Sequence, residues 1–229
     1  MFSISDSKAP GPDGFTSTFF KSSWEIIGTE FTEAIKYFFE KNFLPRCINA
    51  TRIALVPKVE HPSCMDDFRP ISCCNVTYKC ISKVLATRLK TILPNVINSS
   101  QSTFVPGRQI SDNVLLTQEL MHNYHLDNGP PKCALKVDLR KAFDMVSWEY
   151  LLKGLRAVGI PECMVNWIYT CISTTHFSVG LNGESHGFFK SSRGIRQGDP
   201  LSPYLFVLAM EGLGGILTEA SADPGFQFH

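Results

Sequence analysis

Residues 136–144 read Lys136-Val137-Asp138-Leu139-Arg140-Lys141-Ala142-Phe143-Asp144 and are the most informative stretch of the chain. Together with the apolar residues that precede them, they predict a buried strand over residues 133–138 that ends in a carboxylate. A carboxylate in that place can bind a divalent cation at the edge of a sheet, and a second carboxylate nearby would allow two Mg²⁺ ions to be bound. The alternative is that Asp138 caps a turn and Asp144 caps a helix beginning near Trp148.

A second informative segment further along the chain reads Arg193-Gly194-Ile195-Arg196-Gln197-Gly198-Asp199-Pro200-Leu201-Ser202-Pro203. Its glycines allow the backbone to lie close to a ligand. Its arginines suit phosphate groups, and Gln197 can both donate and accept hydrogen bonds. The residues that follow predict the start of a helix, with Ser202 as N-cap and Pro203 at its first position. A plain junction between loop and helix explains the same residues, and the two interpretations are compatible.

The remaining sequence predicts alternating helices and short strands in one α/β unit. Apolar residues at steps of three and four predict a helix between Phe19 and Phe39 and another from Val76 to Leu93, ended by Pro94. Arg69 to Ser72 are expected to lead into that second helix. A strand is expected at residues 52–56 and a hairpin around Asn182-Gly183. Shorter helices are expected at residues 112–124, 148–158, 161–174 and 203–217, with a break at 127–131.

The composition is that of a globular protein with a substantial core, since 44% of the 229 residues are hydrophobic and 19% are charged. The formal net charge of +1 neither favours nor excludes a nucleic-acid partner, which requires local positive potential. The eight cysteines include no Cys-x-x-Cys pair, and no nearby histidine completes a zinc site. Neither a secretory signal nor a membrane span is visible in the sequence. We therefore expect reduced thiols and an intracellular location, in the nucleus or the cytoplasm.

Four segments in one order resemble the reverse transcriptases of LINE (non-long-terminal-repeat) retrotransposons. Asp138 with Ala142-Phe143-Asp144 is similar to their motif A, and the run from Arg196 to Pro203 is similar to their motif B. The early blocks of the plant-type form resemble Lys8-Ala9-Pro10-Gly11-Pro12-Asp13-Gly14-Phe15 and Arg69-Pro70-Ile71-Ser72. Each block alone is a modest signal, but four in the family's order make chance agreement negligible.

The resemblance implies a helix-rich right-hand polymerase of the mixed α/β (α+β) class, with a split βαβ palm. The fingers would span residues 1–130, and residues 131–229 would form a partial palm with motifs A and B. The family's motif C, an Asp-Asp hairpin, is missing after motif B. The only Asp-Asp pair is Asp66-Asp67, which lies in the fingers loop and matches nothing catalytic. The resemblance thus leads us to expect a fragment that is inactive as given.

The resemblance also implies how the complete protein would work, as an RNA-directed DNA polymerase that copies an RNA template from a DNA primer with dNTPs. Asp138 would be the catalytic carboxylate and a ligand of Mg²⁺ in a two-metal site, with the backbone of Leu139 beside the same metal. The residues implied in substrate binding are Lys58 and Arg69 on the triphosphate, Phe143 beneath the sugar, and Gln197 and Gly198 near the nucleotide. Arg193 and Arg196 would contact nucleic acid.

Two other functions stay open from the sequence. One is a non-catalytic RNA- or protein-binding remnant of a decayed element. The other is a viral RNA-dependent RNA polymerase, which Phe143 disfavours because such enzymes place a small polar acid there to admit the 2′-hydroxyl.

Overall fold

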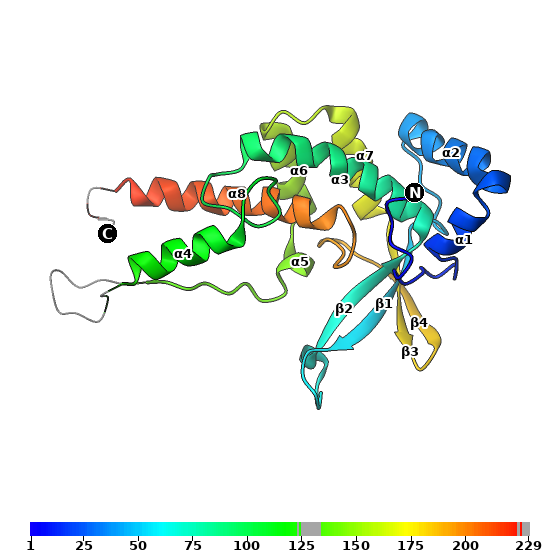
Figure 1. The fold of residues 1–229 in the computed structure, drawn as a ribbon, viewed down its shortest axis with the longest axis horizontal. Helices are drawn as coiled ribbons and strands as arrows, with labels where there is room; N and C mark the ends of the chain where they lie inside the picture. The colour runs from blue at the N-terminus through cyan, green and yellow to red at the C-terminus, as the bar shows by residue number, and fades with distance from the viewer. Residues whose placement is uncertain (123, 125–133, 224, 226–229) are drawn as a thin grey trace.

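The computed structural model describes residues 1–122, 124, 134–223 and 225, which form eight α-helices, one 3₁₀ helix and one four-stranded sheet (Figure 1). In chain order the elements are α1 (Ser17–Ser22), α2 (Trp24–Lys41), β1 (Ala50–Pro57), η1 (Met65–Asp67), β2 (Phe68–Cys74), α3 (Val76–Val96), α4 (Ile110–Leu120), α5 (Ala142–Met145), α6 (Trp148–Ala157), α7 (Glu162–Ser173), β3 (His176–Leu181), β4 (Glu184–Lys190) and α8 (Ser202–Ser221). The mixed α/β class that the sequence predicts is confirmed.

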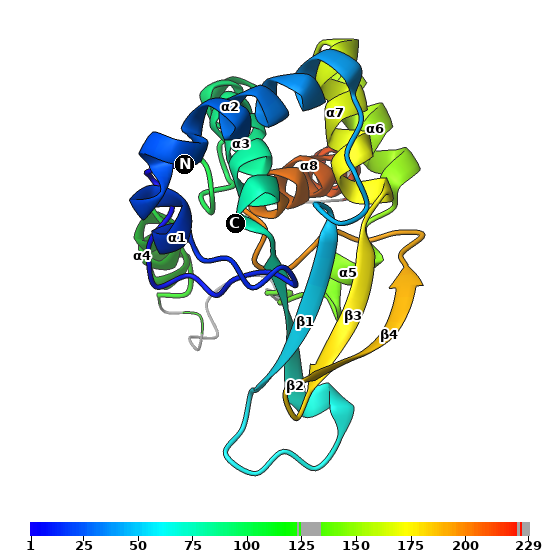
Figure 2. The ribbon, with the colours of Figure 1, turned by 90° about the vertical axis from the view of Figure 1, so that its right-hand side faces the viewer.

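The sheet joins segments that lie far apart in the sequence. Its strand order is β2-β1-β3-β4. The two outer pairs, β1 with β2 and β3 with β4, are antiparallel, whereas β1 and β3 run parallel at the centre. The sheet projects from one end of the molecule, and most helices gather at the other end (Figure 2). Residues on both sides of the proposed boundary at 130 therefore share one sheet.

The hydrophobic core lies among α3, α6, α7 and α8. Its largest side chains with 1% exposure or less include Leu85 and Leu89 of α3, Leu155 of α6, Ile168 of α7 and Leu205 of α8. Each such side chain contributes roughly 1.5–3 kcal/mol by leaving water. A second cluster, of Ile4, Phe31, Val76 and Cys80, attaches the N-terminal segment and α2 to α3. The core thus forms a fixed base from which the sheet and the loops around α5 extend.

Several predicted elements are confirmed with small changes of boundary. The helix expected from Phe19 to Phe39 is divided at Ser23 into α1 and α2. The hairpin is present, and Asn182 and Gly183 have φ of 51° and 87°, as a type I′ turn requires. The last helix runs past its three glycines to Ser221, and α3 continues through Pro94 to Val96.

One predicted strand is wrong, and one observed strand was not predicted. Residues 134–139 form no strand and are exposed, and Cys133 lies outside the described residues, as does the break expected at 127–131. A strand exists only with a hydrogen-bonded neighbour, and no described strand pairs with this segment. Arg69 to Ser72 lead into α3, as expected, but they do so as part of β2, a strand that was not predicted. Pro70 is tolerated there because β2 is an edge strand.

The alternatives that assigned capping roles to single residues are also wrong where the structure describes them. Ser147, and not Asp144, caps α6, because its side chain accepts a hydrogen bond from the backbone N–H of Tyr150. Ser202 is the first residue of α8, and Leu201 stands at the N-cap position.

Candidate functional site

A cavity of about 420 Å³ lies where the β1–β2 end of the sheet faces α5, and its wall contains four of the residues that the sequence singled out. Lys58 follows β1, Arg69 lies on β2, Phe143 lies on α5, and Gln197 comes from the loop before α8. These residues are separated by up to 139 positions in the chain (197 − 58 = 139), so only the fold brings them together. The arrangement combines two cations, an aromatic ring and an amide around one space.

Phe143 contributes to the cavity and to the core at the same time. Its ring stacks on Phe206 of α8, with 4.8 Å between the ring centroids and 12° between the planes. It is half-buried, and its backbone carbonyl accepts a hydrogen bond from the N–H of Ile195 at 2.9 Å. The ring is therefore held by the core while part of it lines the cavity, which makes the two interpretations of this residue compatible.

The two glycines of the loop before α8 are needed for packing within the chain. A Cβ on Gly194, at φ 86°, would lie 2.7 Å from the backbone oxygen of Asp144. A Cβ on Gly198, at φ 102°, would lie 3.3 Å from the carbonyl of Ser72 in β2. Ser72 also donates its backbone N–H to the carbonyl of Gln197 at 2.8 Å. The loop is thus fixed between α5 and β2, with Gln197 at the cavity.

The cations of the cavity differ in how they are engaged. Within the described residues the Arg69 guanidinium makes no hydrogen bond or ion pair, and it is exposed. Lys58 donates from Nζ to the backbone carbonyl of Asp66 at 2.7 Å. Lys141, which also lines the cavity, pairs with the Asp66 carboxylate at 3.3 Å, and Arg140 pairs with the same carboxylate at 2.5 Å. Lys141 adopts a left-handed backbone with φ 51°, an uncommon conformation for a lysine.

Asp144 lies on the wall shared by this cavity and a neighbouring one of about 470 Å³. Burial disfavours its charged form and raises the pKa of the carboxyl, while nearby Lys141 opposes that shift. The second cavity is also lined by Lys190, Arg193 and the phenylalanines 177 and 189, whose rings stack with centroids 5.7 Å apart. Cations beside aromatic faces are suited to single-stranded nucleic acid.

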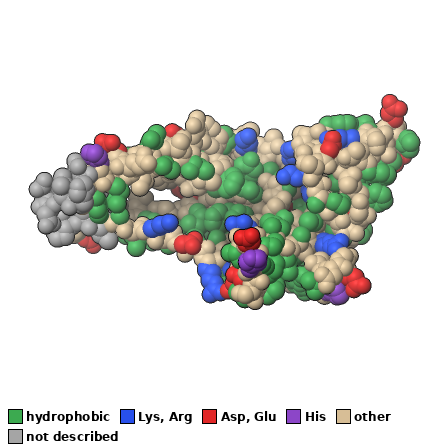
Figure 3. All heavy atoms as spheres, turned by 60° about the horizontal axis from the view of Figure 1, so that its bottom comes forward, with side chains coloured by type: hydrophobic (Ala, Val, Ile, Leu, Met, Phe, Trp, Pro, Cys, Tyr) green, Lys and Arg blue, Asp and Glu red, His purple; other side chains and the backbone are tan. Residues whose placement is uncertain are grey.

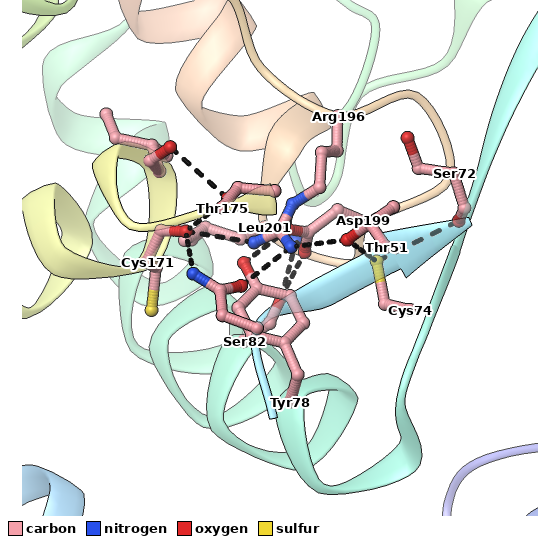
Figure 4. Close-up of polar contacts among 12 residues, drawn as sticks. Thr51, Ser72, Cys74, Tyr78, Ser82, Cys171, Thr175, Arg196, Asp199 and Leu201 are labelled. Carbon is pink, nitrogen blue, oxygen red and sulfur yellow. Dashed lines mark hydrogen bonds and ion pairs between the residues drawn. The ribbon is translucent and has the colours of Figure 1, made fainter. Parts of the chain in front are cut away.

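Arg196 differs from the expectation: it borders the second cavity but is only 5% exposed, and its guanidinium is engaged by groups inside the chain. Its Nη1 donates to the side chains of Asn49 at 2.8 Å and Thr51 at 3.1 Å. Its Nη2 donates to the carbonyl of Cys171 at 3.0 Å, and its guanidinium lies 3.7 Å above the ring of Tyr78 (Figure 4). Arg196 therefore connects β1, α7 and α3 from inside.

The buried carboxylate of Asp199 completes this network, which Figure 4 shows at the start of α8. It accepts hydrogen bonds from Tyr78 at 2.6 Å, from Ser82, and from the backbone N–H of Leu201 at 2.9 Å. Arg196 Nε lies 3.4 Å from the same carboxylate. Burial disfavours the Arg196 cation, yet its pKa is raised overall by the negative charge that Tyr78, Cys74 and Asp199 can carry. Burial also raises the pKa of the Cys171 thiol to about 12.

Asp138 and Leu139 lie apart from both cavities. They belong to the exposed segment before α5 and are not among the residues that line either space. Among the described residues, no group of three or more His, Cys, Asp or Glu side chains could hold a metal ion. The described donors therefore do not fit a complete Mg²⁺ site, and Asp138 stands as a single carboxylate. In the same residues no helix has the length and apolar character of a membrane span.

The sequence did not identify Lys141, Asp66 and Asp144 as residues that line the cavity of about 420 Å³. Lys141 and Asp144 belong to motif A, but their spacing does not show which side chains of that turn face the sheet. Asp66 could have been found only by recognising β2, which brings the 58–67 loop back towards α5. On the face that Figure 3 shows, basic and acidic side chains are scattered among hydrophobic ones.

Comparison with known proteins gives several matches. The sequence profile described as "Reverse transcriptase (RNA-dependent DNA polymerase)" matches residues 56–225. The chain is 35% identical over 204 residues to the transposon TX1 uncharacterized 149 kDa protein of Xenopus laevis, covering 89% of this chain and 16% of that protein. It is 31% identical over 210 residues to the retrovirus-related Pol polyprotein from type-2 retrotransposable element R2DM of Drosophila melanogaster, covering 92% and 19%.

A shorter match is 55% identical over 50 residues to an uncharacterized mitochondrial protein of Arabidopsis thaliana, covering 20% of this chain and 41% of that protein. The chain spans 16% and 19% of the two longer relatives, so it corresponds to one part of each. The extent of these matches and the convergence of motif A and motif B residues on one cavity show that the chain belongs to the reverse transcriptase (RNA-dependent DNA polymerase) family, in the branch of the non-long-terminal-repeat retrotransposons.

Proposed function

We propose that the cavity lined by Lys58, Arg69, Phe143 and Gln197 binds the incoming deoxynucleoside triphosphate, and that the complete protein is an RNA-directed DNA polymerase of a plant-type retrotransposon. The observation that carries this proposal is the convergence of four separately assigned side chains on one space of about 420 Å³. The identity to an Arabidopsis thaliana protein supports the plant-type assignment.

The chemistry of the cavity suits a nucleoside triphosphate. The guanidinium of Arg69, which has no partner among the described residues, can form two parallel hydrogen bonds to phosphate oxygens. Lys58 can add a second cation once it leaves its carbonyl partner. The Phe143 ring offers an apolar surface for the sugar and a steric barrier to a 2′-hydroxyl. Gln197 can contact the base or the template because its amide both donates and accepts.

The neighbouring cavity is our candidate for the template. Arg193 and Lys190 supply positive charge there, and the stacked rings of Phe177 and Phe189 offer aromatic surface to a base. The two cavities share Pro70, Lys141, Asp144 and Gln197, so a template nucleotide in one would lie next to the triphosphate in the other. Of the two arginines expected to contact nucleic acid, we propose this role only for Arg193, because Arg196 is buried.

Asp138 is the only residue of the chain that we propose as a side-chain ligand of Mg²⁺. We propose that this carboxylate, with the backbone of Leu139 beside it, supplies one ligand of a two-metal site whose other ligands are not among the described residues. A metal ion held there would supply stabilisation of negative charge on the reacting oxygens, and Asp138 would be the residue that holds it. We therefore expect the 229 residues alone to bind nucleotide without extending a primer.

A non-catalytic RNA-binding function is the second candidate. It is favoured by the exposure of Asp138 outside both cavities, together with a cationic and aromatic second cavity that needs no metal to bind a single strand. This function predicts RNA binding that does not depend on the Arg69 side chain.

The proposed function predicts that Arg69→Gln weakens binding of dGTP to the purified chain by roughly tenfold or more, since a hydrogen bond to a charged group contributes about 1.5–3 kcal/mol. Calorimetric titration measures the dissociation constant. Arg46→Gln is the matched control, because Arg46 is equally an exposed arginine but lies outside both cavities. Equal effects of the two substitutions would remove Arg69 from the nucleotide site.

A further inference from the structure

Asp66 contacts the cations of the nucleotide cavity, although nothing in the family motifs assigns it a role. Its carboxylate lies 2.5 Å from Arg140 Nη2 and 3.3 Å from Lys141 Nζ. Its backbone carbonyl accepts the hydrogen bond from Lys58 at 2.7 Å. One residue of the fingers loop thus engages three cations, two of which line the same cavity as Arg69.

The neighbouring Asp67 has a different environment. Its Oδ2 accepts hydrogen bonds from the backbone N–H groups of Ser63 at 2.8 Å and Cys64 at 3.0 Å. These contacts stay within the loop and stabilise the turn of η1. The two adjacent carboxylates therefore contact different parts of the chain. Asp67 stabilises its own loop. Asp66 pairs with Arg140 and Lys141, which form the motif A turn before α5.

The charges of the cavity show what the Asp66 contacts do. Lys58, Arg69 and Lys141 give three positive charges, and Asp66 and Asp144 give two negative charges, so the wall carries +1 (3 − 2 = 1). Without the Asp66 charge it would carry +2 (3 − 1 = 2). Hydrogen bonding from Lys141 and the charges of Lys141 and Arg140 lower the pKa of the Asp66 carboxyl, so that it is ionised at neutral pH.

We propose that Asp66 is an internal competitor of the triphosphate: its carboxylate occupies Lys141, and its backbone carbonyl holds Lys58, until phosphate oxygens replace both contacts. Asp66 then sets the affinity of the cavity for polyphosphate. The contacts are suited to this exchange because all three paired side chains are more than half exposed: Arg140 is 79% exposed, Lys141 57% and Asp66 55%. Exposed ion pairs of this kind are weak and are readily exchanged. The inference rests on the proposed nucleotide site.

The test compares Asp66→Asn with Asp67→Asn in the 229-residue chain, using inorganic triphosphate and dGTP as probes in calorimetric titrations. Removal of a competing exposed ion pair should tighten binding about two- to fivefold in Asp66→Asn. Asp67→Asn removes an equal charge from the next residue and should leave the dissociation constant unchanged, since its carboxylate does not line the cavity. Thermal unfolding of both variants verifies that each is folded.

A second measurement detects the exchange in the unmodified protein. Saturating inorganic triphosphate should increase hydrogen exchange at the loop amides of residues 63–67, because the loop loses its attachment to the motif A turn. The same amides should exchange faster in Asp66→Asn without any ligand. Unchanged exchange in both experiments would overturn the proposal even if the variants differ in affinity.

The outcomes separate this inference from the proposed function. If Arg69→Gln weakens triphosphate binding but Asp66→Asn binds no more tightly than the unmodified chain, Asp66 is a surface ion pair and only the inference fails. If Arg69→Gln has no effect or no probe binds at all, the nucleotide site itself is wrong, and the inference fails with it. An equal gain in Asp67→Asn would assign the effect to net charge and overturn the role of Asp66.

Discussion

At the scale of single residues, burial separates two arginines that the sequence presents alike. Arg193 and Arg196 stand three positions apart in one loop, yet Arg193 is exposed at a cavity and Arg196 is 5% exposed inside a hydrogen-bonded network. The partners of Arg196 come from β1, α3 and α7, so no local pattern could reveal them. The phosphate-binding role expected of Arg196 is replaced by an internal ion pair with Asp199.

This network predicts a large loss of stability in Arg196→Met. The substitution would leave Asp199 as a buried charge without its cationic partner, which costs about 3–5 kcal/mol. Urea unfolding followed by circular dichroism measures the free energy of unfolding. Arg193→Met, at an exposed position of the same loop, should change it by less than about 0.5 kcal/mol.

A double variant distinguishes the ion pair from mere packing. Adding Asp199→Leu to Arg196→Met removes both charges and should recover part of the loss, because no uncompensated charge then remains buried. A double variant that loses the full sum of the two single effects would show that the two residues do not act as a pair.

At the scale of elements, the loop before α8 is positioned by backbone contacts that only glycine permits. Gly194 donates its N–H to the carbonyl of Val146 at 2.8 Å, and its carbonyl accepts from Trp148 Nε1 at 2.7 Å. These contacts hold the loop against α5 and the start of α6. The position of Gln197 at the cavity therefore depends on how closely two chain segments approach.

Gly194→Ala should destabilise the protein more than Gly107→Ala, although both glycines have positive φ. Gly107 has φ 78° with open space around its Cβ direction, so its substitution reports only the strained backbone, about 1–2 kcal/mol. At Gly194 a methyl group would also lie 2.7 Å from the carbonyl oxygen of Asp144, and relieving that overlap adds about 1–3 kcal/mol. Urea unfolding of both variants provides the comparison. Equal losses would show that α5 moves aside freely.

The elements also show how far the sequence could be interpreted. Helices with a clear apolar repeat, such as α3, α6 and α7, and the Asn-Gly hairpin were predictable because their signals are local. The predicted strand at residues 133–138 failed because an apolar run forms a strand only beside a partner, and the described strands offer none. β2 was missed because Pro70 argues locally against a strand, while the edge position that tolerates it is a property of the whole sheet.

The candidate site was predictable to a similar extent. Resemblance to family motifs identified Lys58, Arg69, Phe143 and Gln197, which the structure gathers in one cavity. It could not identify Asp66, whose carboxylate meets Arg140 only because the loop folds back over 74 positions of sequence (140 − 66 = 74). A residue such as Asp66, which belongs to no family motif, could be identified only from its contacts in the structure.

At the scale of the whole molecule, packing is uneven. α3, α6, α7 and α8 share the core, whereas α4 contains no buried residue. Its apolar side chains face outward, with Leu115 62% and Leu116 57% exposed. In Figure 1 the helix is drawn below α8, apart from α3, α6 and α7. A helix of 11 residues has little stability of its own without such packing.

We therefore predict that α4 is the least protected helix of the isolated chain and the main site of its self-association. Hydrogen exchange should be fast at residues 110–120 and slow in α3, whose apolar face is buried. Replacing Leu115 and Leu116 by lysine should lower self-association in analytical ultracentrifugation, because it removes exposed apolar area from α4. The free energy of unfolding should change by less than about 0.5 kcal/mol, as expected for positions outside the core.

Ile26→Lys is the control: Ile26 is 80% exposed on α2, so its substitution should change neither self-association nor the free energy of unfolding. Protection of α4 equal to that of α3, with unchanged self-association in the double lysine variant, would show that α4 is packed in solution and that the core extends further than the structure shows.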